Sequence, residues 1–63
     1  MCLSTAFELR GDEKRKLCEH VSSIALFPGK VKLSDIMGAE MIIDGALDSI
    51  DLMKNEIIIL PMK

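Results

Sequence analysis

Aromatic residues are nearly absent from this chain of 63 residues, which contains Phe7 and Phe27 but neither tyrosine nor tryptophan. Proteins that bind single-stranded nucleic acid usually stack bases on aromatic side chains along a basic groove. The formal net charge is −2, so the chain also lacks the basic excess that favours binding to nucleic acids and anionic membranes. Both deficits argue against a general role in nucleic-acid binding.

Long hydrophobic runs are also missing. No stretch approaches the roughly 20 apolar residues of a membrane-spanning helix. The apolar start, residues 2–7, passes directly into charged residues and lacks the apolar core of a signal peptide. We therefore expect a cytoplasmic protein without a membrane anchor. In a reducing cytosol, its two cysteines are expected to be metal-binding, reactive or buried rather than joined in a disulfide.

Hydrophobic residues nevertheless make up 49% of the chain, enough for the core of one domain over residues 1–63. A core of this size contributes little net stability, about 3–5 kcal/mol, and such domains often need a partner, a metal or disulfides.

Short apolar segments separated by glycine, proline and asparagine run through the whole chain. Residues 30–34 alternate between polar and apolar, the period of a half-buried strand. We predict extended segments at residues 3–9, 16–27, 30–34, 40–53 and 56–60.

Glycine and other turn residues suggest where these segments bend and end. We expect a bend near Glu19 and His20, and a bulge at Asp44-Gly45, since glycine within a strand often marks one. Pro28-Gly29 matches a type II turn, and Lys54-Asn55 is expected to form a tight hairpin connection. An amphipathic helix over residues 39–53 is the alternative, which Gly45 disfavours.

Five to six short antiparallel strands in so short a chain predict an all-β fold. The expected architecture is a small SH3-like or Sm-like barrel.

Cys2 has the clearest capacity for metal chemistry. If Met1 is removed, the new terminal amine and the thiolate of Cys2 can close a five-membered chelate ring; if Met1 is kept, the thiolate and the amide nitrogen of Cys2 remain. Such nitrogen and sulfur donors suit square-planar Ni(II) or Cu(II). The competing interpretation is a small buried residue that begins the first strand.

Cys18 and His20 form a weaker second candidate. Residues two apart in a strand point to the same face, but one Cys-x-His pair is far less specific than a repeated Cys-x-x-Cys motif. We expect Cys18 to be a buried core thiol and His20 to be exposed.

The remaining polar and sulfur-containing residues are expected to have structural roles. The acidic series does not match a calcium-binding loop and is expected to be a solvated face; it consists of Asp44, Asp48 and Asp51. Methionines commonly fill irregular core gaps, which is what we expect of Met37, Met41, Met53 and Met62. With a single histidine and no recognisable catalytic set, the chain is not expected to be an enzyme.

The start of the chain and its second half carry a specific combination of motifs. They are residues 1–6 (MCLSTA), 38–40 (GAE), 44–45 (DG) and 50–60 (IDLMKNEIIIL). In these motifs, and over essentially its whole length, the sequence resembles the CooT-type family of small nickel-binding proteins. That family is associated with nickel supply to carbon monoxide dehydrogenase, and its members were earlier labelled predicted RNA-binding proteins because of their Sm-like barrel.

The resemblance implies a homodimer in which Cys2 from both subunits binds nickel near the two-fold axis. A two-fold interface presents the same patch twice, so that one cysteine per chain becomes a paired thiolate site. The expected function is that of a metallochaperone with a client enzyme.

Two alternatives remain open. One is an Sm-like RNA-binding module, for which the only candidate surface is the basic group Arg10, Lys14, Arg15 and Lys16. The other is a protein-interaction module that docks a partner at a strand edge.

Overall fold

The computed structural model describes residues 3–61, which form five strands and no helix. In chain order the strands are β1 (Ser4–Arg10), β2 (Glu13–Phe27), β3 (Lys30–Asp35), β4 (Glu40–Asp51) and β5 (Glu56–Pro61). In the described part of the chain, no helix has the length and apolar character needed to cross a membrane.

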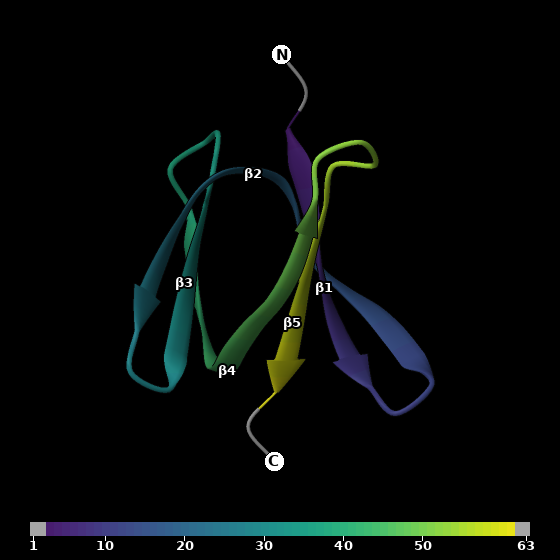
Figure 1. Ribbon diagram of the computed structural model, residues 1–63. Coiled ribbons are helices and arrows are strands. Elements are labelled where there is room, and N and C mark those ends of the chain that lie inside the picture. The colour runs from purple at the N-terminus through teal and green to yellow at the C-terminus, as the bar shows by residue number, and fades with distance from the viewer. Residues whose placement is uncertain (1–2, 62–63) are drawn as a thin grey trace.

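The strands close into a barrel in the order β1-β2-β3-β4-β5 (Figure 1). Consecutive strands pair antiparallel, as short connections require, whereas β5 closes the ring by pairing parallel to β1. The predicted small all-β barrel is confirmed, with one parallel pairing in an otherwise antiparallel sheet.

β2 is long enough to serve two parts of the barrel. Its first half pairs with β1 and its second half with β3. Between the two halves the register with β1 shifts, and His20 has a φ of 60°. A bulge bends a strand and increases its twist, so the predicted bend near Glu19 and His20 is confirmed. β2 begins at Glu13, three residues before the predicted start.

β4 curves in the same way, pairing first with β3 and then with β5. The strand prediction for this segment is therefore correct and the helical alternative is wrong. The predicted bulge is displaced, because pairing is regular at Asp44 and Gly45 and the register shifts instead between Leu47 and Ser49. Gly45 has a different role: a Cβ atom there would collide with the backbone carbonyl oxygen of Leu60.

The turns follow local side-chain chemistry. Gly29 has a φ of 74°, as the second central position of a type II turn requires. The β4–β5 connection spans residues 52–55, longer than the predicted pair. It is stabilised by Asp51, whose Oδ1 accepts hydrogen bonds from the amides of Met53 and Lys54 at 3.0 and 3.1 Å. An aspartate that bonds backbone amides two and three residues ahead fixes a turn locally.

The barrel interior is filled by small and branched apolar side chains. Its buried core consists of Ala6, Val21, Val31, Leu33, Ile57 and Ile59. Every strand except β4 contributes, and the partly buried Ile43 and Leu47 of β4 pack against this cluster.

Candidate functional site

The predicted metal ligand, Cys2, lies outside the described residues. What the structure describes is the surface at which the chain enters the barrel. Ser4, the first residue of β1, pairs with Val21 of β2. The amide of Thr5 donates a hydrogen bond of 2.9 Å to the carbonyl oxygen of Asn55 in the β4–β5 turn. These contacts hold the start of β1 against β2 and the β4–β5 turn.

Large apolar side chains project from the turns at this end of the barrel. Figure 1 shows the start of β1, the β3–β4 turn and the β4–β5 turn at the same end. The two turns carry the most exposed large hydrophobic residues of the described chain: Ile36 (63%), Met37 (87%), Leu52 (80%) and Met53 (94%). The expectation that the methionines fill core gaps is therefore wrong for Met37 and Met53. Tight turns at the rim point their side chains away from the barrel interior. Met62 lies outside the described residues.

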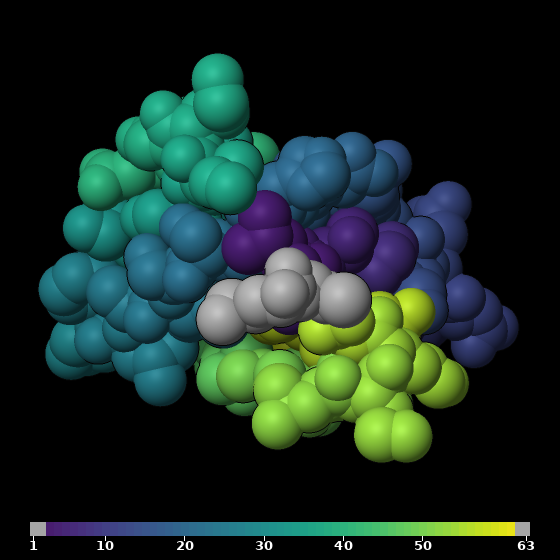
Figure 2. Space-filling model, turned by 90° about the horizontal axis from the view of Figure 1, so that it is seen from above, coloured from purple at the N-terminus to yellow at the C-terminus, as the bar shows by residue number. Residues whose placement is uncertain are grey.

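A groove of about 260 Å³ opens beside the start of β1. Every residue that lines it is uncharged: Ser4, Val21, Ser22, Ser23, Ile24, Ile50, Leu52 and Ile57. Figure 2, which looks onto this end, shows the start of β1 between the blue β2 segment and the yellow-green β4–β5 region. The chain therefore enters the barrel at an apolar surface rather than a charged one.

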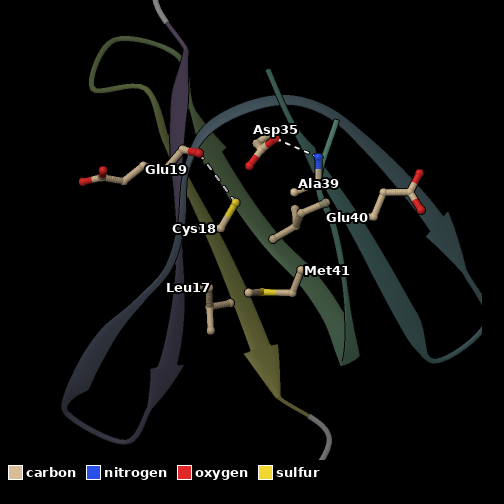
Figure 3. A pocket seen from close by; sticks show the side chains of 8 residues that line it. Leu17, Cys18, Glu19, Asp35, Ala39, Glu40 and Met41 are labelled. Carbon is tan, nitrogen blue, oxygen red and sulfur yellow. Dashed lines mark hydrogen bonds between the residues drawn. The ribbon is translucent and has the colours of Figure 1, made fainter. Parts of the chain in front are cut away.

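Cys18 lines a different groove, also of about 260 Å³, between β2 and the start of β4 (Figure 3). Its thiol donates to the carbonyl oxygen of Glu19 at 3.7 Å. Burial, and then the negative charges of Asp35 and Glu19, raise the pKa of the Cys18 thiol above its ordinary value. A thiol held in its protonated form is a poor nucleophile and a poor metal ligand. Cys18 is half-buried, a little less enclosed than predicted.

The carboxylates of Asp35 and Glu19, near Cys18, form hydrogen bonds with other groups. Asp35 Oδ1 accepts hydrogen bonds from the amides of Met37 and Ala39, both at 2.9 Å. Glu19 binds Lys16 at 2.6 Å, and this contact lowers the pKa of the Glu19 carboxyl. Figure 3 shows the carboxylates of Glu19 and Glu40 directed away from the groove on opposite sides.

His20 is not among the residues that line the Cys18 groove. The two-residue alternation that predicted a common face is interrupted by the bulge of β2 between Cys18 and Val21. His20 is exposed, as expected. Within residues 3–61, no three side chains of His, Cys, Asp or Glu come together as a possible set of metal ligands.

The acidic series is dispersed along β4 rather than gathered into a site. Asp44 pairs with Lys30 at 2.5 Å across the β3–β4 ladder, and Asp51 caps a turn. Asp48 is exposed at the register shift. A solvated face is thus the correct interpretation.

Glu8 is a polar residue that the sequence analysis missed. Its side chain is only 7% exposed, and its Oε1 accepts a 2.8 Å hydrogen bond from Arg15 and lies 3.5 Å from Arg10. The signal was present, because Glu8 lies two residues after the core residue Ala6 and therefore on the same face of β1. Two of the four residues of the basic group thus neutralise an internal carboxylate.

The other two basic residues of the hairpin are also paired. Lys14 binds Glu56 at 3.3 Å and its ammonium group stands 4.6 Å from the ring centre of Phe7. Lys16 is held by Glu19. This pairing reduces the basic character on which the RNA-binding alternative depends.

Fold and surface together define a small closed five-stranded barrel with an apolar end at the start of the chain. The family model of the CO dehydrogenase accessory protein CooT matches residues 1–60, so the chain belongs to that family. The crystal structure of putative CooT from Carboxydothermus hydrogenoformans has the same fold, with a TM-score of 0.89 and 21% sequence identity over 98% of this chain and 100% of that one. The comparison with curated proteins found no match.

Proposed function

We propose that this protein binds nickel and delivers it to a client enzyme of the carbon monoxide dehydrogenase type. The observation that carries the proposal is the family match, which spans residues 1–60 and therefore includes Cys2. In this account the protein is a cytoplasmic metallochaperone and not itself an enzyme. Nickel is its cargo.

The chemistry of the N-terminus supports Ni(II) as that cargo. Cys2 offers a thiolate beside a backbone or terminal nitrogen, a soft and strong-field pair that suits square-planar Ni(II). Metal binding draws the proton from the thiol. Two copies related by a two-fold axis supply two such pairs, which complete four coordination positions without any further side chain.

The ligand set also suits transfer. Thiolate ligands exchange by substitution, so the ligands of a client can replace the cysteine thiolates one at a time. The half-buried Cys18, whose pKa is raised, is not required in this mechanism.

The test is a Ni(II) titration of the reduced protein followed by absorbance. Wild type is expected to develop thiolate-to-nickel charge-transfer bands that saturate, and Cys2→Ser is expected to lose them. Cys18→Ser is the matched control, since it removes one thiol per chain and should leave the bands unchanged. If Cys2→Ser gives the wild-type bands, or wild type gives none, the proposal is wrong.

A further inference from the structure

Val21 is the residue at which β2 changes its strand partner. It pairs with Ser4 of β1 on one edge and with Asp35 of β3 on the other. After Val21, β2 pairs with β3 alone. Within residues 3–61, the edge of β2 that faces β1 therefore has no strand partner after Val21. The unpaired amide and carbonyl groups of such an edge can pair with a further strand.

The direction of β1 brings the preceding part of the chain toward this free edge. β1 and β2 are antiparallel, so a continuation of β1 before Ser4 runs alongside the residues that follow Val21. Two residues of extended chain span at most about 7 Å, which is also the length of two residues along a strand. Residues 1–2 thus have the direction and the reach to pair with the first part of the free edge.

The groove beside the start of β1 follows this edge. Its volume is about 260 Å³, and both Ser4 and Ile24 line it. Alternate side chains of β1 face the barrel interior, since Ala6 is fully buried and Glu8 is 6% exposed. Residues two apart in a strand share a face. In a continued strand, Cys2 therefore shares the face of Ser4, which is the face that lines the groove.

We propose that residues 1–2 extend β1 along the free edge of β2 and hold the Cys2 side chain at the mouth of this groove, with Ser23 and Ile24 as positioning residues. Strand addition at a free edge gains main-chain hydrogen bonds and covers part of the apolar lining of the groove. Residues 1–2 are favoured over a separate partner because they are covalently joined to the strand that already pairs with β2. Their effective concentration at the edge is therefore high.

The consequence for nickel binding is preorganisation of the ligand, and in this respect the inference rests on the proposed function. A ligand that is ordered before the metal arrives loses less conformational freedom on binding. The residues that line the groove include no carboxylate. Hard cations such as Mg²⁺ and Ca²⁺ bind through oxygen ligands, carboxylates above all. A thiol presented here is therefore offered to softer metals such as Ni(II), without a carboxylate from the groove that would recruit the hard cations.

Disulfide trapping in the full chain tests this placement without nickel. In Cys18→Ser/Ser23→Cys, the two thiols are those of Cys2 and of position 23. Facing residues of an antiparallel pair have Cα atoms about 4.5–5.5 Å apart, within the range that a disulfide bridges. With oxidised glutathione as the oxidant, we expect the disulfide to form within one chain, with an effective concentration at least about tenfold above that of the control.

The matched control is Ile42→Cys in the same Cys18→Ser background. Ile42 is 62% exposed, pairs with Lys32 of β3 and does not line the groove. Its thiol should form mixed disulfides with glutathione instead. Circular dichroism shows whether each variant is folded. If Ser23→Cys fails to fold, Ser22→Cys replaces it, because Ser22 is also exposed and lines the same groove.

Peptide mapping of the oxidised proteins decides the outcome. A single-chain disulfide between Cys2 and position 23, without its counterpart at position 42, supports the placement. Equal formation at both positions, or a disulfide that joins two chains, would overturn it. A Ni(II) titration of the Cys18→Ser protein separates the two proposals. Trapping without nickel binding contradicts the proposed function alone, whereas nickel binding without trapping contradicts the placement alone.

Discussion

The carboxylate of Glu8 accepts a 2.8 Å hydrogen bond from Arg15 across the β1–β2 hairpin, although its side chain is only 7% exposed. Glu8 pairs with Ile59 of β5, a core residue. A charged group in such a place is stable only while its partners remain, because removing one leaves a charge that is neither solvated nor paired.

Arg15→Ala is therefore expected to destabilise the fold by about 1–2 kcal/mol. The value is modest because Arg15 is itself 69% exposed and Arg10 remains near Glu8. Urea unfolding measures the change. Lys16→Ala is the control, since Lys16 binds the exposed Glu19 and its loss should alter stability very little. Equal effects of the two variants would show that the burial of Glu8 has no energetic consequence.

Gly45→Ala is expected to destabilise the protein by about 1–3 kcal/mol or more, as overpacking typically does. The new methyl group meets backbone atoms of Leu60 and Pro61, and backbone in a closed barrel has little room to move. Thermal unfolding provides the measurement. Ala46→Ser, at the exposed neighbouring position, should be nearly neutral. A Gly45→Ala protein as stable as wild type would mean that β4 and β5 separate more easily than their close approach suggests.

Cys18 is expected to resist alkylation until the pH is above that needed for a free thiol, because burial and the charges of Asp35 and Glu19 raise its pKa. The rate of iodoacetamide modification against pH, measured in Cys2→Ser, tests this. Glu19→Gln should shift the profile to lower pH. An ordinary thiol profile in the folded protein would contradict it.

The raised pKa of Cys18 also makes the free energy of unfolding depend on pH. The unfolded thiol ionises at a lower pH than the folded one, so the unfolded state loses protons first as the pH rises. The contribution of Cys18 is therefore fully present below the unfolded pKa and declines as the pH rises toward the folded pKa. Cys18→Ser should remove this alkaline loss, which denaturant unfolding between neutral and alkaline pH would detect.

Much of the barrel was predictable from local sequence. Alternating polar and apolar residues identified β3, and the Pro28-Gly29 turn and the bend at His20 fell where local geometry required them. The parallel pairing of β5 with β1 was not predictable from local sequence. It forms only when the bends of β2 and β4 bring the last strand back beside the first. The displaced bulge has the same origin: Gly45 is explained by a carbonyl group 15 residues away in sequence, at Leu60.

In the candidate site, too, the features set by local sequence were predictable and those set by the tertiary fold were not. The chemistry of Cys2 follows from the nitrogen and sulfur atoms of one residue and needs no fold to be recognised. The apolar surface at the start of β1 is built from turns distant in sequence, so that Met37 and Met53 were expected in the core although they lie on the rim. The common face expected of Cys18 and His20 depended on regular alternation, which a bulge between Cys18 and Val21 interrupts.

The central claim is that the Cys2 thiolates of two chains hold one nickel ion. Native mass spectrometry of the reduced protein with Ni(II) tests it most directly, with Cys2→Ser and Cys18→Ser measured in parallel. The account predicts one nickel per two chains in wild type and in Cys18→Ser, and none in Cys2→Ser. Retention of the wild-type nickel load by Cys2→Ser would contradict it.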